Sequence, residues 1–271
     1  MGLRINTNVA ALNTARVLKR STNDLNQTLQ RLSSGLRINR AADDAAGLAI
    51  AEGFRSVVRG AQVSQRNAQD GVSLVQTAEG ALSETTNILQ RIRELAVQAS
   101  NGTQSTNNRI SLNAEVRQLL AQIDDIALDT EFNGLRVLSS SQTVTLQTGA
   151  FTSQTLLVSV AGAKTSDLRV SPVSVSTYVQ AVSAISTVDT ALQSINSLRS
   201  DLGAFQNRLE FTINTLAIQE ENSAASESFI RDADIAQETI RFTRNQILVS
   251  AGTSILAQAN VVPQTALQLL G

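Results

Sequence analysis

The feature that most constrains the fold is a long run of apolar residues at steps of three and four in the last third of the chain. From Tyr178 to Leu216 these residues recur in 11 steps over 38 residues, a mean step of about 3.45. A repeat below 3.6 is typical of a helix with a left-handed coiled-coil seam. At roughly 1.5 Å per residue, this segment alone would extend about 57 Å, which is too long for a compact globule.

Other parts of the chain are also predicted to be helical. A second seam runs from Leu112 to Ile126, and residues 45–99 carry apolar residues at approximate helical spacing. Residues 8–31 contain no Pro or Gly and continue the helical pattern. The polar stretch NGTQSTNN, residues 101–108, is predicted to be a loop. The sequence therefore favours long helices packed side by side.

One central region has a different pattern. Residues 139–160 are rich in Thr, Val and Ser, and apolar residues alternate with polar ones on both sides of Thr148-Gly149. This alternation predicts a β-hairpin with a loop longer than two residues. Ser171-Pro172 then marks the entry to the long helix.

The two ends of the chain are unusually apolar. Residues 249–271 carry apolar side chains nearly all round the predicted helix, too wide a face for one partner helix. The N-terminal helical segment is the expected partner within the chain, and other copies of the chain are expected to cover the rest. The residues predicted to pack between subunits are Val9, Leu12, Leu18, Ile247, Ile255, Leu256, Val261, Leu267 and Leu270.

Composition excludes several classes of site. The chain has no Cys and no His, so thiol nucleophiles, Cys/His zinc sites and the usual neutral-pH general base are absent. We expect no catalytic residue, no metal and no cofactor, and an enzyme is the class with least support. The net charge of −1 gives no footprint for nucleic acid, and no apolar run approaches the roughly 18 residues needed for membrane insertion. No cleaved signal peptide is visible at the N-terminus.

The stretch RLSSGLRINRAADDAAGLAI, residues 31–50, contains an adjacent pair of carboxylates. Asp43 and Asp44 could hold a divalent cation, but adjacent side chains on a helix start diverge and no further carboxylate follows until Glu52. The favoured interpretation is that one of them caps a helix beginning at Ala45. Gly35 is expected to close the preceding helix in the left-handed conformation.

A charged cluster lies in LQRIRELAVQ, residues 89–98. The favoured interpretation is a solvated helix face with local ion pairs. The alternative is a binding surface, because Arg91 and Leu95 are four residues apart and would form an exposed pair on one face.

Several motifs together resemble the bacterial flagellin family. INTNVAALN (5–13), RLSSGLRINRAADDAAGLAIA, RNAQDGVSLVQTAEGAL (66–82) and LQRIRELAVQ are similar to its N-terminal core. TEFNGLRVL (130–138) is similar to the segment before its β-hairpin. RDADIAQE (231–238) and NQILVSAGTSILAQANVVPQTALQLL resemble its C-terminal core.

The resemblance implies a mainly α fold, a long antiparallel helical coiled-coil rod with a small β-hairpin and paired terminal helices. It implies a helical homopolymer, the extracellular filament of the bacterial flagellum, used for swimming motility. Terminal segments of the family are largely disordered in the monomer and fold on assembly, and export uses the flagellar type III apparatus without signal cleavage. Implied partners are an export chaperone bound to about residues 235–270, and the filament cap and hook-junction proteins.

The expected domain organisation follows from the same resemblance. An inner terminal-helix domain would comprise residues 1–44 and 230–271, and a rod domain residues 45–138 and 177–229. Residues 139–176 would supply only the hairpin and flanking loops, because the family's large variable insertion is missing. The zinc peptidase that some members carry there is excluded.

In the family, a host Toll-like receptor recognises the released monomer. The resemblance places its main contacts on Arg91, Leu95 and Glu115. Two other functions stay open at this point: a hook–filament junction protein, and a cell-surface flagellin-like protein that binds polysaccharide. The AEGAL and RELAVQ segments and the short insertion favour flagellin over the first, and the scarcity of aromatic residues argues against the second.

Overall fold

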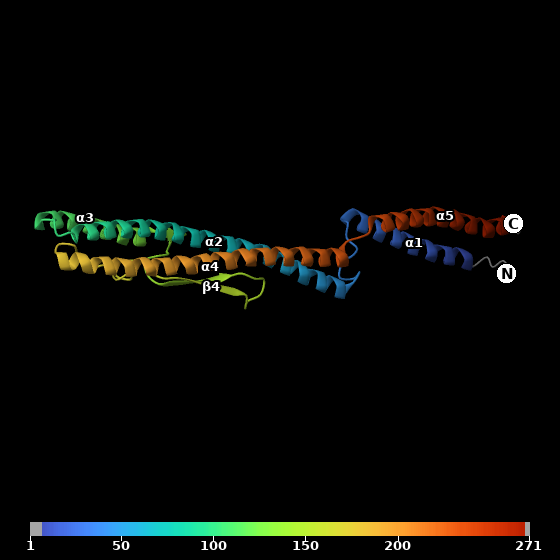
Figure 1. The fold of residues 1–271 in the computed structure, drawn as a ribbon. Helices are drawn as coiled ribbons and strands as arrows, with labels where there is room; N and C mark the ends of the chain where they lie inside the picture. Colours follow the sequence, from blue (N-terminus) through green and yellow to red (C-terminus); the bar gives the residue numbers. More distant parts are fainter. Residues whose placement is uncertain (1–6, 269–271) are drawn as a thin grey trace. The chain divides into compact units, whose positions relative to one another are not determined.

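The chain consists of long helices with two small antiparallel hairpins (Figure 1). The computed structural model describes residues 7–268, with side chains as far as Val261. The elements are α1 (Val9–Ser34), α2 (Ala45–Ala99), α3 (Thr106–Asp129), β1 (Glu131–Phe132), β2 (Leu135–Arg136), β3 (Gln142–Gln147), β4 (Thr155–Val160), α4 (Tyr178–Arg231) and α5 (Ile235–Gln268). The predicted mainly α fold with a small hairpin is confirmed.

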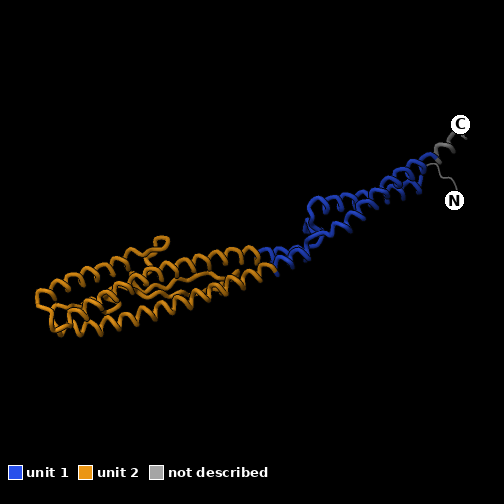
Figure 2. The backbone as a smooth tube through the Cα atoms, turned by 45° about the horizontal axis from the view of Figure 1, so that its top comes forward, with its two compact units in different colours: residues 1–56, 222–271 blue, residues 57–221 orange. Residues whose placement is uncertain are grey.

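The chain forms two compact units (Figure 2). Unit 2 comprises residues 57–221, and unit 1 comprises the flanking segments up to residue 56 and from residue 222. The division between the units therefore falls inside α2 and α4, whereas the domain limits expected from the sequence fall near the ends of these helices.

Unit 2 contains the predicted long seam. On α4 the buried positions recur every seven residues, at Ala181, Val188, Ile195, Leu202, Leu209 and Leu216. The prediction of a seam is thus confirmed, except that its first two members, Tyr178 and Val182, are 54% and 46% exposed, and Ala181 is buried instead. The facing helix α2 buries residues at alternating steps of three and four: Ala61, Ser64, Ala68, Gly71, Val75, Ala78, Leu82, Thr85, Leu89, Ile92, Ala96 and Ala99.

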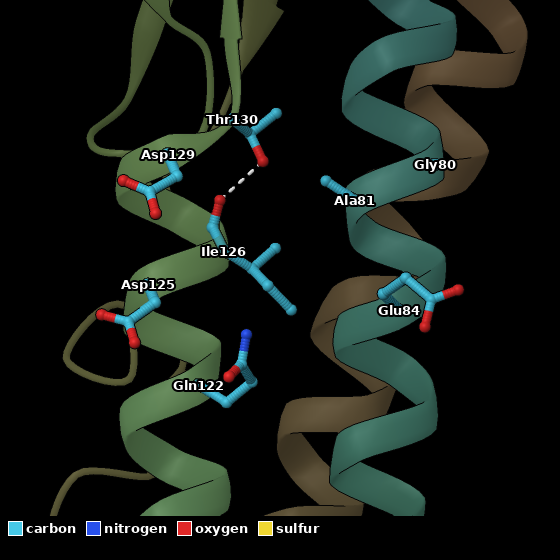
Figure 3. A pocket seen from close by; sticks show the side chains of 8 residues that line it. All are labelled: Gly80, Ala81, Glu84, Gln122, Asp125, Ile126, Asp129 and Thr130. Carbon is cyan, nitrogen blue, oxygen red and sulfur yellow. Dashed lines mark hydrogen bonds between the residues drawn. The ribbon is translucent and has the colours of Figure 1, made fainter.

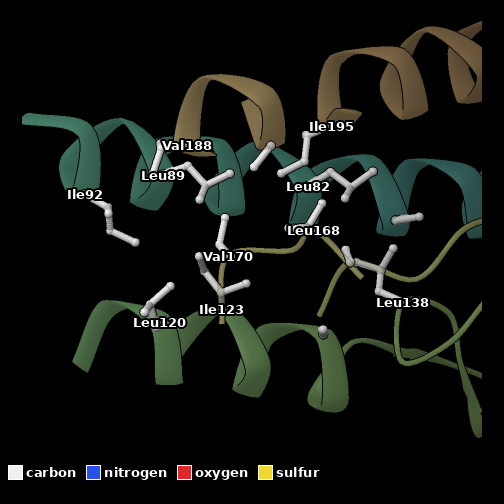
Figure 4. Close-up of a cluster of buried hydrophobic side chains, with 14 of the residues drawn as sticks. Leu82, Leu89, Ile92, Leu120, Ile123, Leu138, Leu168, Val170, Val188 and Ile195 are labelled. Carbon is white, nitrogen blue, oxygen red and sulfur yellow. The ribbon is translucent and has the colours of Figure 1, made fainter. Parts of the chain in front are cut away.

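The widest part of this core lies where α3 and the segment before α4 join α2 and α4 (Figure 4). Leu120 and Ile123 of α3 meet Leu89 and Ile92 of α2, with Val170 between them. The helix α3 begins at Thr106, inside the stretch predicted to be a loop, because Ser105 caps it by accepting the Asn108 N–H at 3.2 Å.

The predicted hairpin is present as β3 and β4, paired antiparallel from Gln142↔Val160 to Gln147↔Thr155. Leu156, Val158 and Val160 are buried and alternate with exposed residues, as a half-buried strand requires. The hairpin lies against α2, where the Asn67 side-chain amide donates to the Gln147 carbonyl at 3.0 Å. A Cβ on Gly71 would collide with Leu146, so this glycine makes room for the strand.

A second, smaller hairpin joins β1 and β2 through Asn133 and Gly134. Their φ angles of 50° and 77° are those of a type I′ turn, which Asn-Gly favours. This turn is not among the elements predicted from the sequence.

Unit 1 pairs the first helix with the last. In Figure 1 α1 and α5 lie side by side, and many of their Cα atoms approach within 8 Å. Residues of α1 turned towards α5 recur at heptad spacing: Ala11, Thr14, Leu18, Ser21, Leu25, Thr28 and Leu32. Those of α5 are Glu238, Phe242, Asn245, Val249, Gly252, Leu256 and Ala259. Small and polar residues alternate with Leu, Phe and Val along this seam.

Candidate functional site: the uncovered faces of the terminal helices

The large apolar residues of α5 lie mostly outside its seam with α1. Ile240 and Ile247 are each 62% exposed, Ile255 is 57% exposed and Leu248 is 47% exposed. We call these four residues the outer face of α5. At about 100° per residue, Ile240 and Ile247 lie on the side of the helix opposite the seam residues, and Leu248 and Ile255 lie at the flank of the seam. Ile240, Ile247 and Leu248 border a shallow apolar groove of about 450 Å³.

The helix α1 has the same distribution. Val9, Leu12 and Val17 are 65%, 62% and 56% exposed, whereas Ser21 and Thr28 are buried. Apolar side chains in water and polar side chains in the seam are the reverse of a self-sufficient helix pair. The arrangement leaves apolar surface on both helices available to further chains.

The structure places the predicted packing residues in three groups. Val9, Leu12, Ile247, Ile255 and Val261 are exposed. Leu18 and Leu256 are half-buried at seam positions, and Leu18 packs so closely on Gly252 that a Cβ there would lie 3.1 Å from Leu18 Cδ1. The side chain of Leu267, and all of Leu270, lie outside the described residues.

The segment between α1 and α2 holds the predicted cap residues. Gly35 ends α1 with φ 70°, and its N–H donates to the Arg31 carbonyl at 2.8 Å. Asp44 precedes α2 and accepts the Gly47 N–H at 2.8 Å, the bond of a helix cap. The carboxylate of Asp44 is therefore occupied by the backbone.

Asp43 has a separate role. Its Oδ2 accepts the backbone N–H groups of Arg40 at 3.0 Å and Asn39 at 3.1 Å, closing the turn before α2. These two bonds stabilise the charged form and hold the pKa of Asp43 below its usual value of 3.8. The two aspartates serve different backbone groups, and no acidic or metal-ligating cluster that could hold a metal ion occurs in residues 7–268.

A network of ion pairs joins the start of α2 to the end of α4 within unit 1. Arg231, with a side chain only 15% exposed, lies 3.0 Å from Glu52 and 3.7 Å from Glu227, and Arg55 also contacts both carboxylates. Beside it, the Arg37 N–H donates to the Arg231 carbonyl and Ala233 N–H to the Gly35 carbonyl, at 2.6 and 2.9 Å. This network is not predictable from local sequence, because its members are up to 179 residues apart.

The second candidate surface lies on α2 and α3 in unit 2. The Arg91 guanidinium donates to Glu115 at 2.9 Å and to Glu94 at 3.1 Å, and these bonds raise its pKa above the ordinary value. The expectation that Leu95 is exposed beside Arg91 is wrong, because Leu95 is 1% exposed and belongs to the core. Four residues along a helix amount to one full turn plus about 40°. Here this difference places Arg91 on the exposed face and Leu95 in the seam.

An acidic groove of about 380 Å³ lies between α2 and α3 (Figure 3). Glu84, Asp125 and Asp129 border it, while Gly80 and Ala81 leave space on the α2 side and the Thr130 hydroxyl donates to the Ile126 carbonyl.

Among the helices that the structure describes, none has the length and apolar character required to cross a membrane.

Comparison with known proteins gives a consistent result. A profile of the bacterial flagellin N-terminal helical region matches residues 5–143, and one of the C-terminal helical region matches residues 185–270. The flagellin of Halalkalibacterium halodurans is 45% identical over 269 residues, covering 98% of this chain and 99% of that protein. The flagellar filament 31.3 kDa core protein of Treponema maltophilum is 44% identical over 283 residues, covering 98% and 99%.

Among solved structures, a putative flagellar hook-associated protein from Vibrio parahaemolyticus shares the fold. Its TM-score is 0.58 at 10% sequence identity, and the match covers 70% of this chain and 99% of that one.

Proposed function

The chain belongs to the bacterial flagellin family and is a structural subunit of the flagellar filament, and we propose that neighbouring copies pack on the uncovered faces of α1 and α5. The observation that carries the proposal is the outer face of α5. Ile240, Ile247 and Ile255 are each more than half exposed, while Ser21, Thr28 and Glu238 are buried in the seam inside the chain. Burying one such side chain contributes about 1.5–3 kcal/mol, and every subunit added to a filament would bury several.

The two units would have different roles in the filament. Unit 2 has a closed apolar core, so it supplies a folded body for each subunit. The terminal helices supply adhesive surface, and their folding is coupled to the arrival of neighbours. This role needs no catalytic group, cofactor or metal, so we propose that the chain is not an enzyme.

Electron microscopy of the purified protein in precipitating salt tests the proposal. We expect long uniform filaments from the native chain and none from a variant in which Ile240 and Ile247 are both replaced by Asp. A matched variant carries Asp at Gln246 and Thr253, exposed polar positions seven residues apart on a different side of the same helix, and should still polymerise. Persistent monomers from the native chain, or filaments from the Ile240/Ile247 variant, would overturn the proposal.

Outside the filament, the same apolar surfaces need temporary cover. We propose that the export chaperone binds about residues 235–270, since an amphipathic helix with an open apolar stripe fits a hydrophobic groove on a partner. Export would proceed without cleavage of a signal peptide, and the filament cap and hook-junction proteins would contact the same terminal region. Co-purification of the chaperone with the native chain, but not with the Ile240/Ile247 variant, is the expected result.

We further propose that a host Toll-like receptor detects the released monomer through the surface around Arg91 and Glu115. Both side chains are about half exposed and are joined by an ion pair, and Leu95 supports them from the core. Charge reversal at Arg91 should reduce the response of a receptor reporter cell line. The same change at Arg93, which pairs with Asp189 on another helix, is the control. Equal responses from both variants would refute this assignment.

A further inference from the structure

The seam between α1 and α5 repeats itself along its length. On α1, Leu occurs at positions 18, 25 and 32, and Thr, Ser and Thr at 14, 21 and 28, each set exactly one heptad apart. On α5, the large residues Phe242, Val249 and Leu256 share the same spacing. Sliding one helix by seven residues therefore places similar residues opposite one another. Apolar packing alone does not determine which register the two helices adopt.

The structure nevertheless has one register. The Asn8 side-chain amide donates to the Ala259 carbonyl at 2.8 Å, Leu18 packs on Gly252, and Arg31 meets Glu238 at 3.3 Å. These contacts progress in opposite directions along the two helices, so the pair is antiparallel. Of the three, only the contact between Arg31 and Glu238 joins side chains of opposite charge.

Glu238 is unusual for a charged residue. Its side chain is 5% exposed, and its Oε1 accepts from Arg31 at 3.3 Å and from Arg241 at 2.9 Å. In the described part of the chain, neither its Oε2 nor the Arg31 Nε has a hydrogen-bond partner, although both atoms are buried. A buried, incompletely satisfied ion pair contributes little net stability compared with apolar residues of similar size. Its value is therefore expected to lie in specificity.

We propose that Arg31 and Glu238 are positioning residues that fix the register of α1 against α5. In a coiled coil, one polar residue in the seam can select a register at some cost in stability. A slip of one heptad in one direction would bury Glu238 against Leu25, beside the like charge of Asp24. A slip in the other direction would carry Glu238 past the end of α1 at Ser34. Both slips separate Glu238 from Arg31.

The inference rests on the proposed function, because register matters when α1 and α5 present one fixed pattern of apolar residues to neighbouring copies. A slip of one heptad moves that pattern by about 10 Å. Copies in different registers would not present matching surfaces to each other.

The absence of cysteine makes the register measurable by disulfide trapping. In the Leu18→Cys/Gly252→Cys variant the Cβ atoms would be 3.7 Å apart, a separation that suits a disulfide. Leu18→Cys/Asn245→Cys and Leu18→Cys/Ala259→Cys report slips of one heptad in either direction. Each pair is oxidised in polymerised protein, and non-reducing gels separate looped monomers from cross-linked dimers.

We expect only the 18–252 disulfide in the native background. Adding Arg31→Leu/Glu238→Leu should leave the protein folded and raise the slipped disulfides by about tenfold or more. A purely structural role would instead predict loss of folding without a change in register. The swapped pair Arg31→Glu/Glu238→Arg should restore the native disulfide, and Arg241→Leu, which leaves the pair between the helices, should not change it.

The outcomes separate the two proposals. If the native chain does not polymerise, the proposed function fails. If it polymerises and the leucine variant still forms only the 18–252 disulfide, the register is set elsewhere, for example by the backbone bonds between Gly35 and Ala233, and the inference fails. Should the leucine variant not polymerise, Glu238→Gln, which keeps the size and removes the charge, decides between the same two results.

Discussion

The two seams of the molecule share one heptad spacing and differ in what they bury. The unit 2 seam buries Leu82, Leu89 and Ile92 completely, against a similar series on α4. The unit 1 seam mixes Ser, Thr, Gly and Ala with half-buried Leu, Phe and Val, and leaves its isoleucines outside. A heptad pattern therefore indicates where two helices meet. The size and polarity of the residues at its positions indicate whether the pair buries its apolar side chains without further partners.

The largest expected difference concerns a core position of unit 2. Leu89→Ala should lower the free energy of unfolding by about 2–5 kcal/mol, because Leu89 is fully buried and its removal leaves a cavity. Denaturant unfolding of the monomer followed by circular dichroism measures this change. Val97→Ala on the same helix, where the side chain is 47% exposed, should change it by less than about 0.5 kcal/mol. Similar losses from both would contradict the assignment of the core.

An outer-face position should behave in the opposite way. Ile247→Ala is expected to leave the unfolding of the monomer unchanged within about 0.5 kcal/mol. It should raise the critical concentration for polymerisation by about tenfold, corresponding to the loss of roughly 1.4 kcal/mol of burial per subunit. Sedimentation of polymers at a series of protein concentrations gives this value. An unchanged critical concentration would exclude Ile247 from the contact between subunits.

A smaller effect tests why glycine occurs in the unit 2 seam. Gly71→Ala should destabilise unit 2 by about 1–2 kcal/mol, because the new methyl group would collide with Leu146 and lie 3.3 Å from a Leu209 methyl carbon. Gly80→Ala on the same helix meets nothing within 4 Å and should stabilise by up to about 1 kcal/mol through helix propensity. Thermal unfolding of both variants, which differ only in the site of one methyl group, gives the comparison. A stabilised Gly71→Ala variant would show that the hairpin can move aside.

The smallest expected effect is a pH dependence in unit 1. Since the pKa of Asp43 is lowered in the folded protein, its contribution to stability is complete above the unfolded value of 3.8 and is lost as the pH falls through the folded value. Asp43→Asn should remove this part of the acid dependence, and Asp24→Asn is the exposed control. Nuclear magnetic resonance titration of the Asp43 carboxyl measures the folded pKa directly. A pKa at or above 3.8 would mean that the turn does not bind the charged form.

The sequence predicted the α4 side of the unit 2 seam better than the α2 side, because a count of apolar periodicity detects large residues and overlooks small ones. The α4 heptad from Val188 to Leu216 emerged correctly, whereas the small seam residues of α2, such as Ser64 and Gly71, did not. Gly71 leaves room for the Leu146 side chain of β3, a tertiary contact that local sequence does not encode. Ala181 was missed in favour of its larger neighbour Val182 for the same reason.

Helix-capping contacts were predictable because the residues that form them are close in sequence. Gly35, with its positive φ, and Asp44, which accepts a backbone N–H three residues later, depend only on short-range geometry. Asp234 caps α5 in the same way, by accepting the Gln237 N–H, and its position before the helix was a signal that could have identified it. The Asn133-Gly134 turn was also readable. The ion pairs of Arg31 and Arg231 were not, because their partners on other helices are 207 and 179 residues away.

The pairing of the first helix with the last has a consequence for how the chain folds. Contacts of α1 with α5 join residues more than 200 positions apart, so the loop that must close is nearly the whole chain. When unit 2 folds, it closes most of that loop, since Gln62 and Glu220 meet at 2.7 Å within it. The two ends are then tethered at a high effective concentration. Folding of unit 2 therefore lowers the entropic cost of pairing α1 with α5.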